Sequence, residues 1–192
     1  MPIKTPVCDF GKKAENFELK STENKLISLN DIKGENGTLI MFICNHCPYV
    51  KAIIKDVVED CTKLNDLGIN SVAICSNDPI NYPEDSFEKM IEFAIKHKFN
   101  FPYLIDETQD IARKYEAVCT PDFFGYDKGF GLEYRGRIRE LRELKPVLVL
   151  LILLFFLYIR DQNLYHNRKN LEYIQLHIFL QCLVFHQLGK EN

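Results

Sequence analysis

The feature that most constrains the fold of this chain is a pair of cysteines, Cys44 and Cys47, placed between an apolar run and an amphipathic segment. The run over residues 39–44 is continuous and rich in strand formers, which predicts a strand buried on both faces of a sheet. Pro48 favours the first turn of a helix, where its missing N–H would have no partner. Apolar residues then recur every three or four positions until Gly68, which predicts a helix packed on that sheet.

The other predicted elements alternate between strands and helices, which favours an α/β fold with helices flanking a central mixed sheet. We expect an opening hairpin around Phe17–Leu19 and Ile27–Leu29, strands over 69–75 and 101–105, a loop over 77–83, a helix over 87–95, and a closing hairpin of 123–126 with 132–138. Asp106 and Gln109 resemble a capping box, which predicts a further helix through Tyr115.

The last quarter of the chain has a different composition. Residues 139–192 hold fourteen leucines, against eight in the first 138 residues, so we predict a domain over 1–138 and an atypical Leu-rich helical tail over 139–192. A reading-frame change near Arg139 or an unrelated replacement of a closing helix would produce such a tail. The apolar run over 147–159 would span only about 20 Å as a helix, short of the ~30 Å hydrocarbon core. This length argues against a membrane span and leaves membrane association as the less favoured alternative.

Charge and cysteine usage narrow the class of protein. Twenty-four basic and twenty-seven acidic residues give a net charge of −3 without a basic stripe, which excludes an evident nucleic-acid surface. The seven cysteines are an odd number and show no framework spacing beyond one close pair. The first ten residues lack the apolar core of a secretory signal, so we expect a reducing, cytoplasmic compartment.

In such a compartment a close cysteine pair at a helix start predicts redox chemistry. The N–H groups and the dipole of a helix N-terminus stabilise a thiolate and lower the pKa of a cysteine from its usual value of ~8.5. We predict that Cys44 is the nucleophile and that Cys47, one turn into the helix, is the less exposed resolving thiol. Asn45 and His46 lie between them and tune the pair, and a protonated His46 would lower the pKa of Cys44 further.

A metal site is the alternative interpretation of the same pair. Zinc normally takes four ligands, often from a second close pair, and residues 1–138 contain no second pair of this kind. We therefore predict neither a metal nor another cofactor, and keep a metal-binding protein as the least favoured function. Cys61 and Cys75 lie on predicted core positions and are expected to be packing residues. Cys119 is expected to pack as well, with a role as a third thiol as the alternative.

A second informative position is Pro121, at the start of a predicted strand. A proline there can adopt the cis peptide, with the preceding backbone facing the cysteine pair. We predict that Thr120 and Pro121 form a substrate-binding edge, with the backbone of Thr120 pairing with an incoming strand.

Taken together, these motifs resemble the redoxins grouped as the alkyl hydroperoxide reductase and thiol-specific antioxidant family. The motifs are Cys-Asn-His-Cys-Pro-Tyr-Val at 44–50, Asn-Tyr-Pro-Glu-Asp-Ser-Phe at 81–87, Phe-Pro-Tyr-Leu at 101–104, Cys-Thr-Pro-Asp-Phe-Phe at 119–124 and Tyr-Arg-Gly-Arg at 134–137. The resemblance covers about residues 8–138. It implies a thioredoxin-like fold, a redox-active dithiol at Cys44 and Cys47, a cis proline at Pro121, and partners that are protein or small-molecule thiols and disulfides.

The resemblance also implies a rival activity, the thiol-dependent reduction of hydroperoxides. Peroxiredoxins carry a hydroxyl residue three positions before the reactive cysteine, whereas here Met41 precedes Cys44 and Cys44 precedes Cys47. The arginine partner of such a site is also not assigned among Arg113, Arg135 and Arg137. Thiol–disulfide exchange is therefore the preferred prediction, and hydroperoxide reduction is the alternative.

Overall fold

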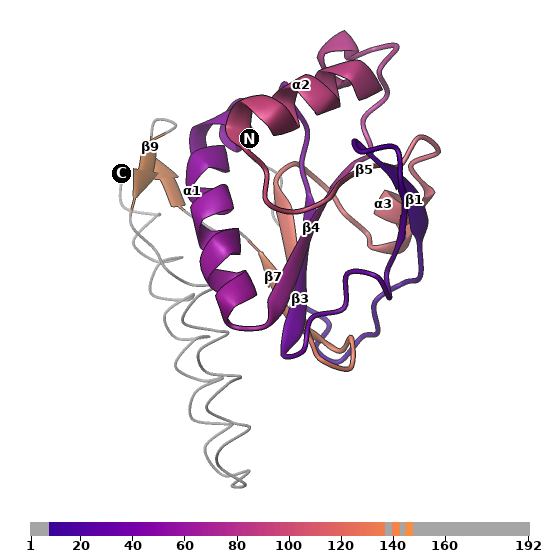
Figure 1. Ribbon diagram of the computed structural model, residues 1–192, viewed down its shortest axis with the longest axis vertical. Helices are drawn as coiled ribbons and strands as arrows, with labels where there is room; N and C mark the ends of the chain where they lie inside the picture. The colour runs from indigo at the N-terminus through magenta and orange to yellow at the C-terminus, as the bar shows by residue number, and fades with distance from the viewer. Residues whose placement is uncertain (1–7, 137–139, 143–144, 148–192) are drawn as a thin grey trace, which may run out of the picture. The chain divides into compact units, whose positions relative to one another are not determined.

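A seven-stranded mixed sheet forms the centre of the protein (Figure 1). The computed structural model describes residues 8–136, 140–142 and 145–147. The strands of the sheet are β1 (Glu18–Ser21), β2 (Leu26–Ser28), β3 (Gly37–Phe42), β4 (Ile69–Cys75), β5 (Tyr103–Ile105), β6 (Asp122–Asp127) and β7 (Leu132–Gly136). They lie in the order β2-β1-β5-β4-β3-β6-β7.

The pairing of these strands confirms the predicted thioredoxin-like arrangement. β3, β4 and β5 are parallel, and the two hairpins β1–β2 and β6–β7 add antiparallel strands at either side. β6 runs antiparallel to β3, with Asp122 opposite Phe42. The end of β3 and the start of β6 therefore meet at one edge of the sheet, which brings Cys44 close to the segment that precedes β6.

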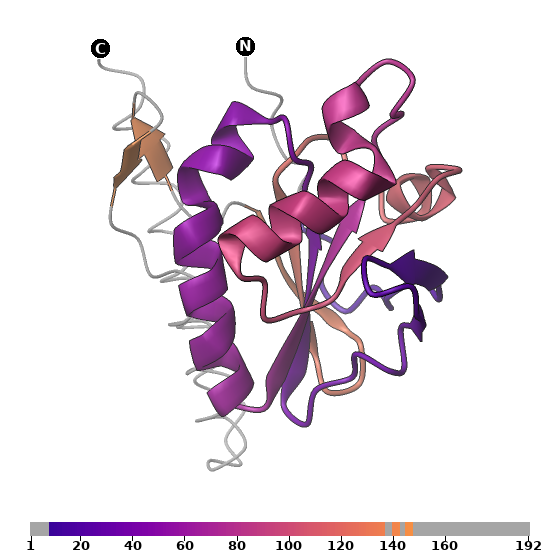
Figure 2. The same ribbon diagram turned by 45° about the horizontal axis from the view of Figure 1, so that its top comes forward.

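Two long helices cover one face of this sheet, as Figures 1 and 2 show. The helices are α1 (Pro48–Asp66), α2 (Phe87–His97) and the short α3 (Asp110–Lys114), with a 3₁₀ turn η1 (Pro83–Asp85) before α2. The predicted α1 is confirmed, with Pro48 in its first turn. Its buried apolar residues are Val50, Ile53, Ile54, Val57, Cys61 and Leu64. They follow the predicted spacing, so packing on the sheet stabilises this helix.

The opposite face of the sheet carries an aromatic core. Phe42 contacts both Tyr115 and Phe124, with ring centroids 5.5 and 5.7 Å apart. Apolar residues of β3, β4 and β6 join these rings, so both faces of the central strands are buried. This double burial explains why residues 39–44 read as a continuous apolar run rather than an alternating one.

The predicted capping box before α3 is wrong. The helix begins at Asp110, and Gln109 precedes it in a left-handed conformation with φ of 62°. Asp106 is buried, and its Oδ2 accepts hydrogen bonds from the Ser76 hydroxyl and from the Ala112 backbone N–H. Asp106 therefore links Ser76, which follows β4, to Ala112 in the middle of α3 through hydrogen bonds. It does not form the predicted capping box with Gln109.

The beginning of the Leu-rich tail also differs from the predicted helix. β8 (Glu140–Arg142) and β9 (Lys145–Val147) form a two-stranded antiparallel ladder. Pro146 lies in this ladder, and proline is unfavourable inside a helix because it removes a hydrogen bond and its ring clashes. The predicted boundary at residue 138 and the remainder of the run over 147–159 lie outside the described residues. Within the described part of the chain, no helix has the length and apolarity needed to cross a membrane.

Candidate active site at the end of the central strand

Cys44 and Cys47 lie side by side between β3 and α1. Cys44 follows β3 by two residues, and Cys47 is the residue that precedes the first turn of α1. The two side chains are hydrogen-bonded to each other, and both are free thiols. The strand and the helix thus hold two sulfur atoms in contact, as a dithiol that closes and opens a disulfide requires.

Thr120 contacts both sulfur atoms through two different groups. Its hydroxyl lies 3.2 Å from the Cys44 sulfur, and its carbonyl oxygen accepts a hydrogen bond of 3.2 Å from the Cys47 thiol. The predicted cis peptide between Thr120 and Pro121 is confirmed. From the sequence we predict only a backbone role for Thr120, since its hydroxyl is 76 residues from Cys44 along the chain. No local pattern predicts that contact.

The exposure of the two cysteines is opposite to the prediction. Cys44 is 0% exposed and Cys47, which immediately precedes α1, is 8% exposed. A hydrogen bond from Cys44, together with the backbone N–H groups of Val50 and Tyr49, lowers the pKa of Cys47 to about 5. Burial acts in the opposite direction, and these three donors together with the Thr120 side chain outweigh it.

The pKa of Cys44 is raised. Its contact with Cys47 is the largest cause, followed by burial, and the charge of Asp85 acts in the same direction. The predicted N–H groups reach both sulfur atoms: the Cys47 backbone N–H bonds to the Cys44 sulfur, and those of Tyr49 and Val50 bond to the Cys47 sulfur. In a coupled pair the first proton lost belongs to the pair rather than to either cysteine alone.

The two residues between the cysteines are fixed by a carboxylate that the sequence analysis missed. Asp85 in η1 is buried and accepts hydrogen bonds from the backbone N–H groups of Asn45, at 2.7 Å, and His46, at 3.2 Å. Its other oxygen contacts His46 Nδ1 at 2.5 Å. The predicted tuning residue His46 is therefore directed at Asp85. The Tyr82 ring stacks on the His46 imidazole with centroids 4.7 Å apart.

Asn45, the other predicted tuning residue, is also held on both sides. Its amide donates to the Glu84 carbonyl and its oxygen accepts from the Tyr103 hydroxyl at 3.0 Å. The signal that could have found Asp85 is topological, because loops at the carboxyl ends of adjacent parallel strands meet at one edge of the sheet. β3 and β4 are such strands, and the loop after β4 carries Asp85.

Cys44, His46 and Asp85 offer potential ligand atoms within 4.8 Å of one another. Both Asp85 oxygens, however, already accept two hydrogen bonds each, the fourth coming from the Asn77 amide at 2.7 Å. A carboxylate has about four acceptor positions, so this one is saturated by the protein. The chemistry of this group of residues fits a satisfied polar network around a dithiol better than a metal centre.

The other described cysteines lie apart from the dithiol chemistry. Cys61 and Cys75 are buried as predicted, and desolvation raises their pKa values to about 12 and about 11. Cys119 is half-buried, and its thiol donates to the Pro121 carbonyl at 3.8 Å. A thiol held in its protonated form is a poor nucleophile, so Cys61 and Cys75 act as packing residues.

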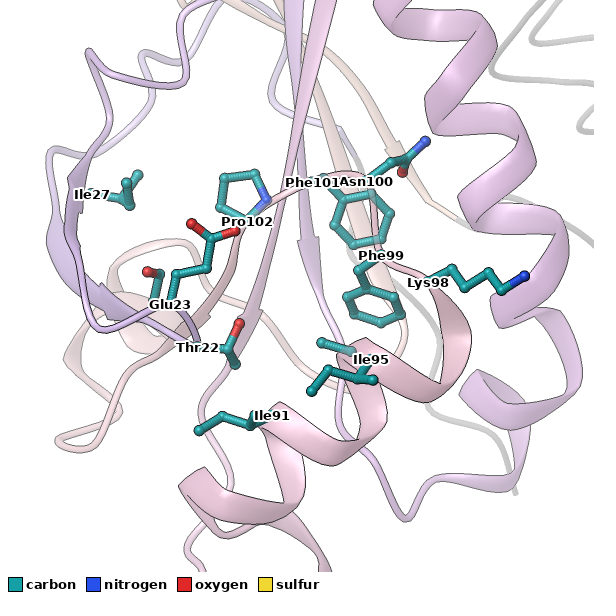
Figure 3. A pocket seen from close by; sticks show the side chains of 12 residues that line it. Thr22, Glu23, Ile27, Ile91, Ile95, Lys98, Phe99, Asn100, Phe101 and Pro102 are labelled. Carbon is teal, nitrogen blue, oxygen red and sulfur yellow. The ribbon is translucent and has the colours of Figure 1, made fainter.

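An open cavity of about 580 Å³ lies between the β1–β2 turn, α2 and the loop that follows α2 (Figure 3). Ile91 and Ile95 of α2 and the rings of Phe99 and Phe101 give it an apolar wall. None of its lining residues belongs to the dithiol site. The cavity is therefore not the place where a substrate would meet the sulfur atoms.

Comparison with known proteins agrees with this geometry. The chain is 40% identical to an uncharacterized conserved protein from Geobacillus kaustophilus, with 78% of this chain and 80% of that chain covered and a TM-score of 0.74. It is 33% identical to a hypothetical protein from Sinorhizobium meliloti, with 73% and 77% covered and a TM-score of 0.71. A secreted disulfide oxidoreductase of Mycobacterium tuberculosis shares the fold, with 17% identity, 61% and 80% coverage and a TM-score of 0.52.

No curated protein matches the sequence significantly. The model of the AhpC/TSA family matches residues 10–141, which include the whole sheet and the dithiol. With a thioredoxin-like sheet, a cysteine pair at the start of its first long helix and a cis proline beside that pair, this chain belongs to the AhpC/TSA family.

Proposed function

We propose that the protein is a thiol–disulfide oxidoreductase that uses Cys44 and Cys47 as its redox-active dithiol. The observation that carries this proposal is the contact between the two thiols, with Thr120 bonded to both sulfur atoms. The mycobacterial disulfide oxidoreductase that shares the fold supports the same class of reaction.

We assign the first attack to Cys47, because it is the more exposed of the two thiols. The Cys47 thiolate attacks one sulfur of a substrate disulfide, which forms a mixed disulfide and releases the other substrate sulfur as a thiolate. That thiolate takes the Cys44 proton, and Cys44 then attacks Cys47. The Cys44–Cys47 bond closes, the second substrate thiol leaves, and two electrons have passed from the protein to the substrate. This order reverses the roles predicted from the sequence.

Trapping of the mixed disulfide tests both the function and the order. With a peptide disulfide as substrate, Cys44→Ser should accumulate the mixed disulfide at Cys47, because the resolving thiol is absent. Cys47→Ser should trap little, and Cys119→Ser, a cysteine beside the site, should turn over as the wild type does. Accumulation in Cys47→Ser alone would restore Cys44 as the attacking thiol, and no adduct in either variant would refute the function.

Hydroperoxide reduction is the second candidate, and one contact favours it. The Thr120 hydroxyl lies 3.2 Å from the Cys44 sulfur and supplies the hydroxyl group that the sequence lacks three positions earlier. Two of the three candidate arginines weigh against it, since Arg113 bonds to Asp110 and Arg135 bonds to Asp122. The third, Arg137, lies outside the described residues. Consumption of hydrogen peroxide, compared with reduction of insulin disulfides by the same thiol donor, separates the two activities.

We also propose that the protein works in a reducing compartment such as the cytoplasm. The seven cysteines are an odd number and show no framework spacing beyond the Cys44–Cys47 pair, which fits a compartment in which thiols stay reduced. In this setting the substrates would be thiols and disulfides of proteins or small molecules.

A further inference from the structure

Asp85 is the residue of the site with the most contacts to the segment between the cysteines. Its Oδ1 accepts from the backbone N–H groups of Asn45 and His46, and its Oδ2 contacts His46 Nδ1 and accepts from the Asn77 amide. Asp85 itself is 1% exposed. Four donors meet the four acceptor positions of an ionised carboxylate, so the site is built around a negative charge.

These contacts fix the conformation of the Cys44–Cys47 loop. A buried backbone N–H without a partner is costly, so the loop peptide planes at Asn45 and His46 turn toward the carboxylate. The imidazole of His46 contacts Asp85 through Nδ1 and stacks on the Tyr82 ring, with an angle of 2° between the two ring planes. The spacing of the two sulfur atoms therefore depends on a residue 38 positions beyond Cys47.

The charge of Asp85 also acts unequally on the two sulfur atoms. An Asp85 carboxylate oxygen lies within 4.8 Å of the Cys44 sulfur, whereas the sulfur of Cys47 faces the N–H groups at the start of α1. A negative charge at this distance in a buried site disfavours a second negative charge nearby. It therefore directs the thiolate away from Cys44.

Resting on the proposed function, we propose that Asp85 is the positioning residue of the dithiol. It holds the inter-cysteine loop through four hydrogen bonds, and its charge keeps the thiolate on Cys47 and makes the couple more reducing. The second effect arises because the charge destabilises the reduced, thiolate-bearing form and leaves the neutral disulfide almost unaffected. A more reducing couple favours the reduction of substrate disulfides over the oxidation of substrate thiols.

The test compares Asp85→Asn with Asp106→Asn in the full chain. Asp106 is an equally buried carboxylate at the end of the neighbouring strand, but its partners Ser76 and Ala112 lie outside the dithiol loop. Each protein is equilibrated with glutathione, and the thiols are alkylated and assigned by mass spectrometry. We expect Asp85→Asn to be about tenfold easier to reduce, which is about 30 mV for a two-electron couple, and Asp106→Asn to match the wild type within about twofold.

A second readout on the same proteins is the distribution of alkylation between the cysteines in brief exposure to iodoacetamide. Removal of the charge should raise the share of alkylation at Cys44 by about threefold or more. The buried Cys61 and Cys75, which general loosening of the fold would also expose, should stay unmodified. An unchanged equilibrium and an unchanged share in Asp85→Asn would overturn the proposal.

If Asp85→Asn does not fold, the wild type still provides a test. The His46 Nδ1 proton should be protected from exchange with water in NMR spectra, and an imidazole that exchanges freely would overturn the role of Asp85. Wild-type protein that forms no Cys44–Cys47 disulfide in the glutathione experiment would refute the proposed function itself. A disulfide that forms equally in wild type and Asp85→Asn would refute only the role of Asp85.

Discussion

Replacement of Thr120 by valine should raise the pH at which the dithiol loses its first proton. The Thr120 hydroxyl is 3.2 Å from the Cys44 sulfur and lowers the pKa of both thiols of the pair. Valine has nearly the same shape but no hydroxyl, so Thr120→Val removes one hydrogen bond to the coupled pair of sulfur atoms. The cis peptide bond and the Thr120 carbonyl, which accepts from Cys47, belong to the backbone and stay in place.

The expected size follows from the value of one such bond. A hydrogen bond to a charged group contributes about 1.5–3 kcal/mol. One pKa unit corresponds to about 1.36 kcal/mol, so the first ionisation should rise by about 1–2 units. Because the hydroxyl is shared between two sulfur atoms, the lower end of this range, about 1 unit, is the expected result.

The ultraviolet absorbance of the thiolate, followed as a function of pH, measures this first ionisation without assigning it to one cysteine. Thr120→Ser is the matched control, since it keeps the hydroxyl and should titrate as the wild type does. If Thr120→Val and Thr120→Ser titrate together, the hydroxyl does not stabilise the thiolate and the electrostatic account of the site is wrong.

Three further results are expected. Tyr103→Phe removes the hydroxyl that bonds to Asn45 at 3.0 Å and leaves a buried acceptor unpaired. The free energy of unfolding in urea should therefore fall by about 1–3 kcal/mol, and an unchanged value would show that this bond is not required. Arg135→Met breaks a buried ion pair with Asp122, 3.3 Å long, and should lower the free energy of unfolding by about 3–5 kcal/mol. The double variant Arg135→Met with Asp122→Asn should recover part of this loss. A loss below about 1 kcal/mol would contradict the burial of the pair. The folded protein lowers the pKa of Cys47 from 9.0 to about 5, so the unfolded chain binds more protons between these values. The stability of the reduced protein should then rise with pH across this window, by at most about 1.4 kcal/mol per pH unit, and urea denaturation of Cys47→Ser should lack this rise.

The sequence predicts much of the fold because each element carries its own local signal. The apolar stripe from Val50 to Leu64 and the proline after Cys47 place α1 correctly. The run that ends at Cys44 places a buried central strand, and the cis proline beside the pair is also predicted. In each case the signal lies within a few turns of one segment, where periodicity and turn chemistry act.

The contacts that control the chemistry are not local, and the sequence does not predict them. Asp85 meets Asn45 from 40 residues away, and the Thr120 hydroxyl meets Cys44 from 76 residues away. The order of exposure of the cysteines is likewise a tertiary property, with Cys44 more deeply buried than Cys47. The failed capping box at Asp106 has the same cause, because a tertiary bond to Ser76 replaces the local one.

The most direct test of the account is whether Cys44 and Cys47 form a reversible disulfide. Purified protein is equilibrated with mixtures of reduced and oxidised glutathione, its free thiols are blocked, and the peptides are mapped by mass spectrometry. The account predicts a Cys44–Cys47 disulfide whose fraction follows the glutathione ratio, while Cys61 and Cys75 stay reduced. Two free thiols at positions 44 and 47 under every oxidising mixture would contradict it.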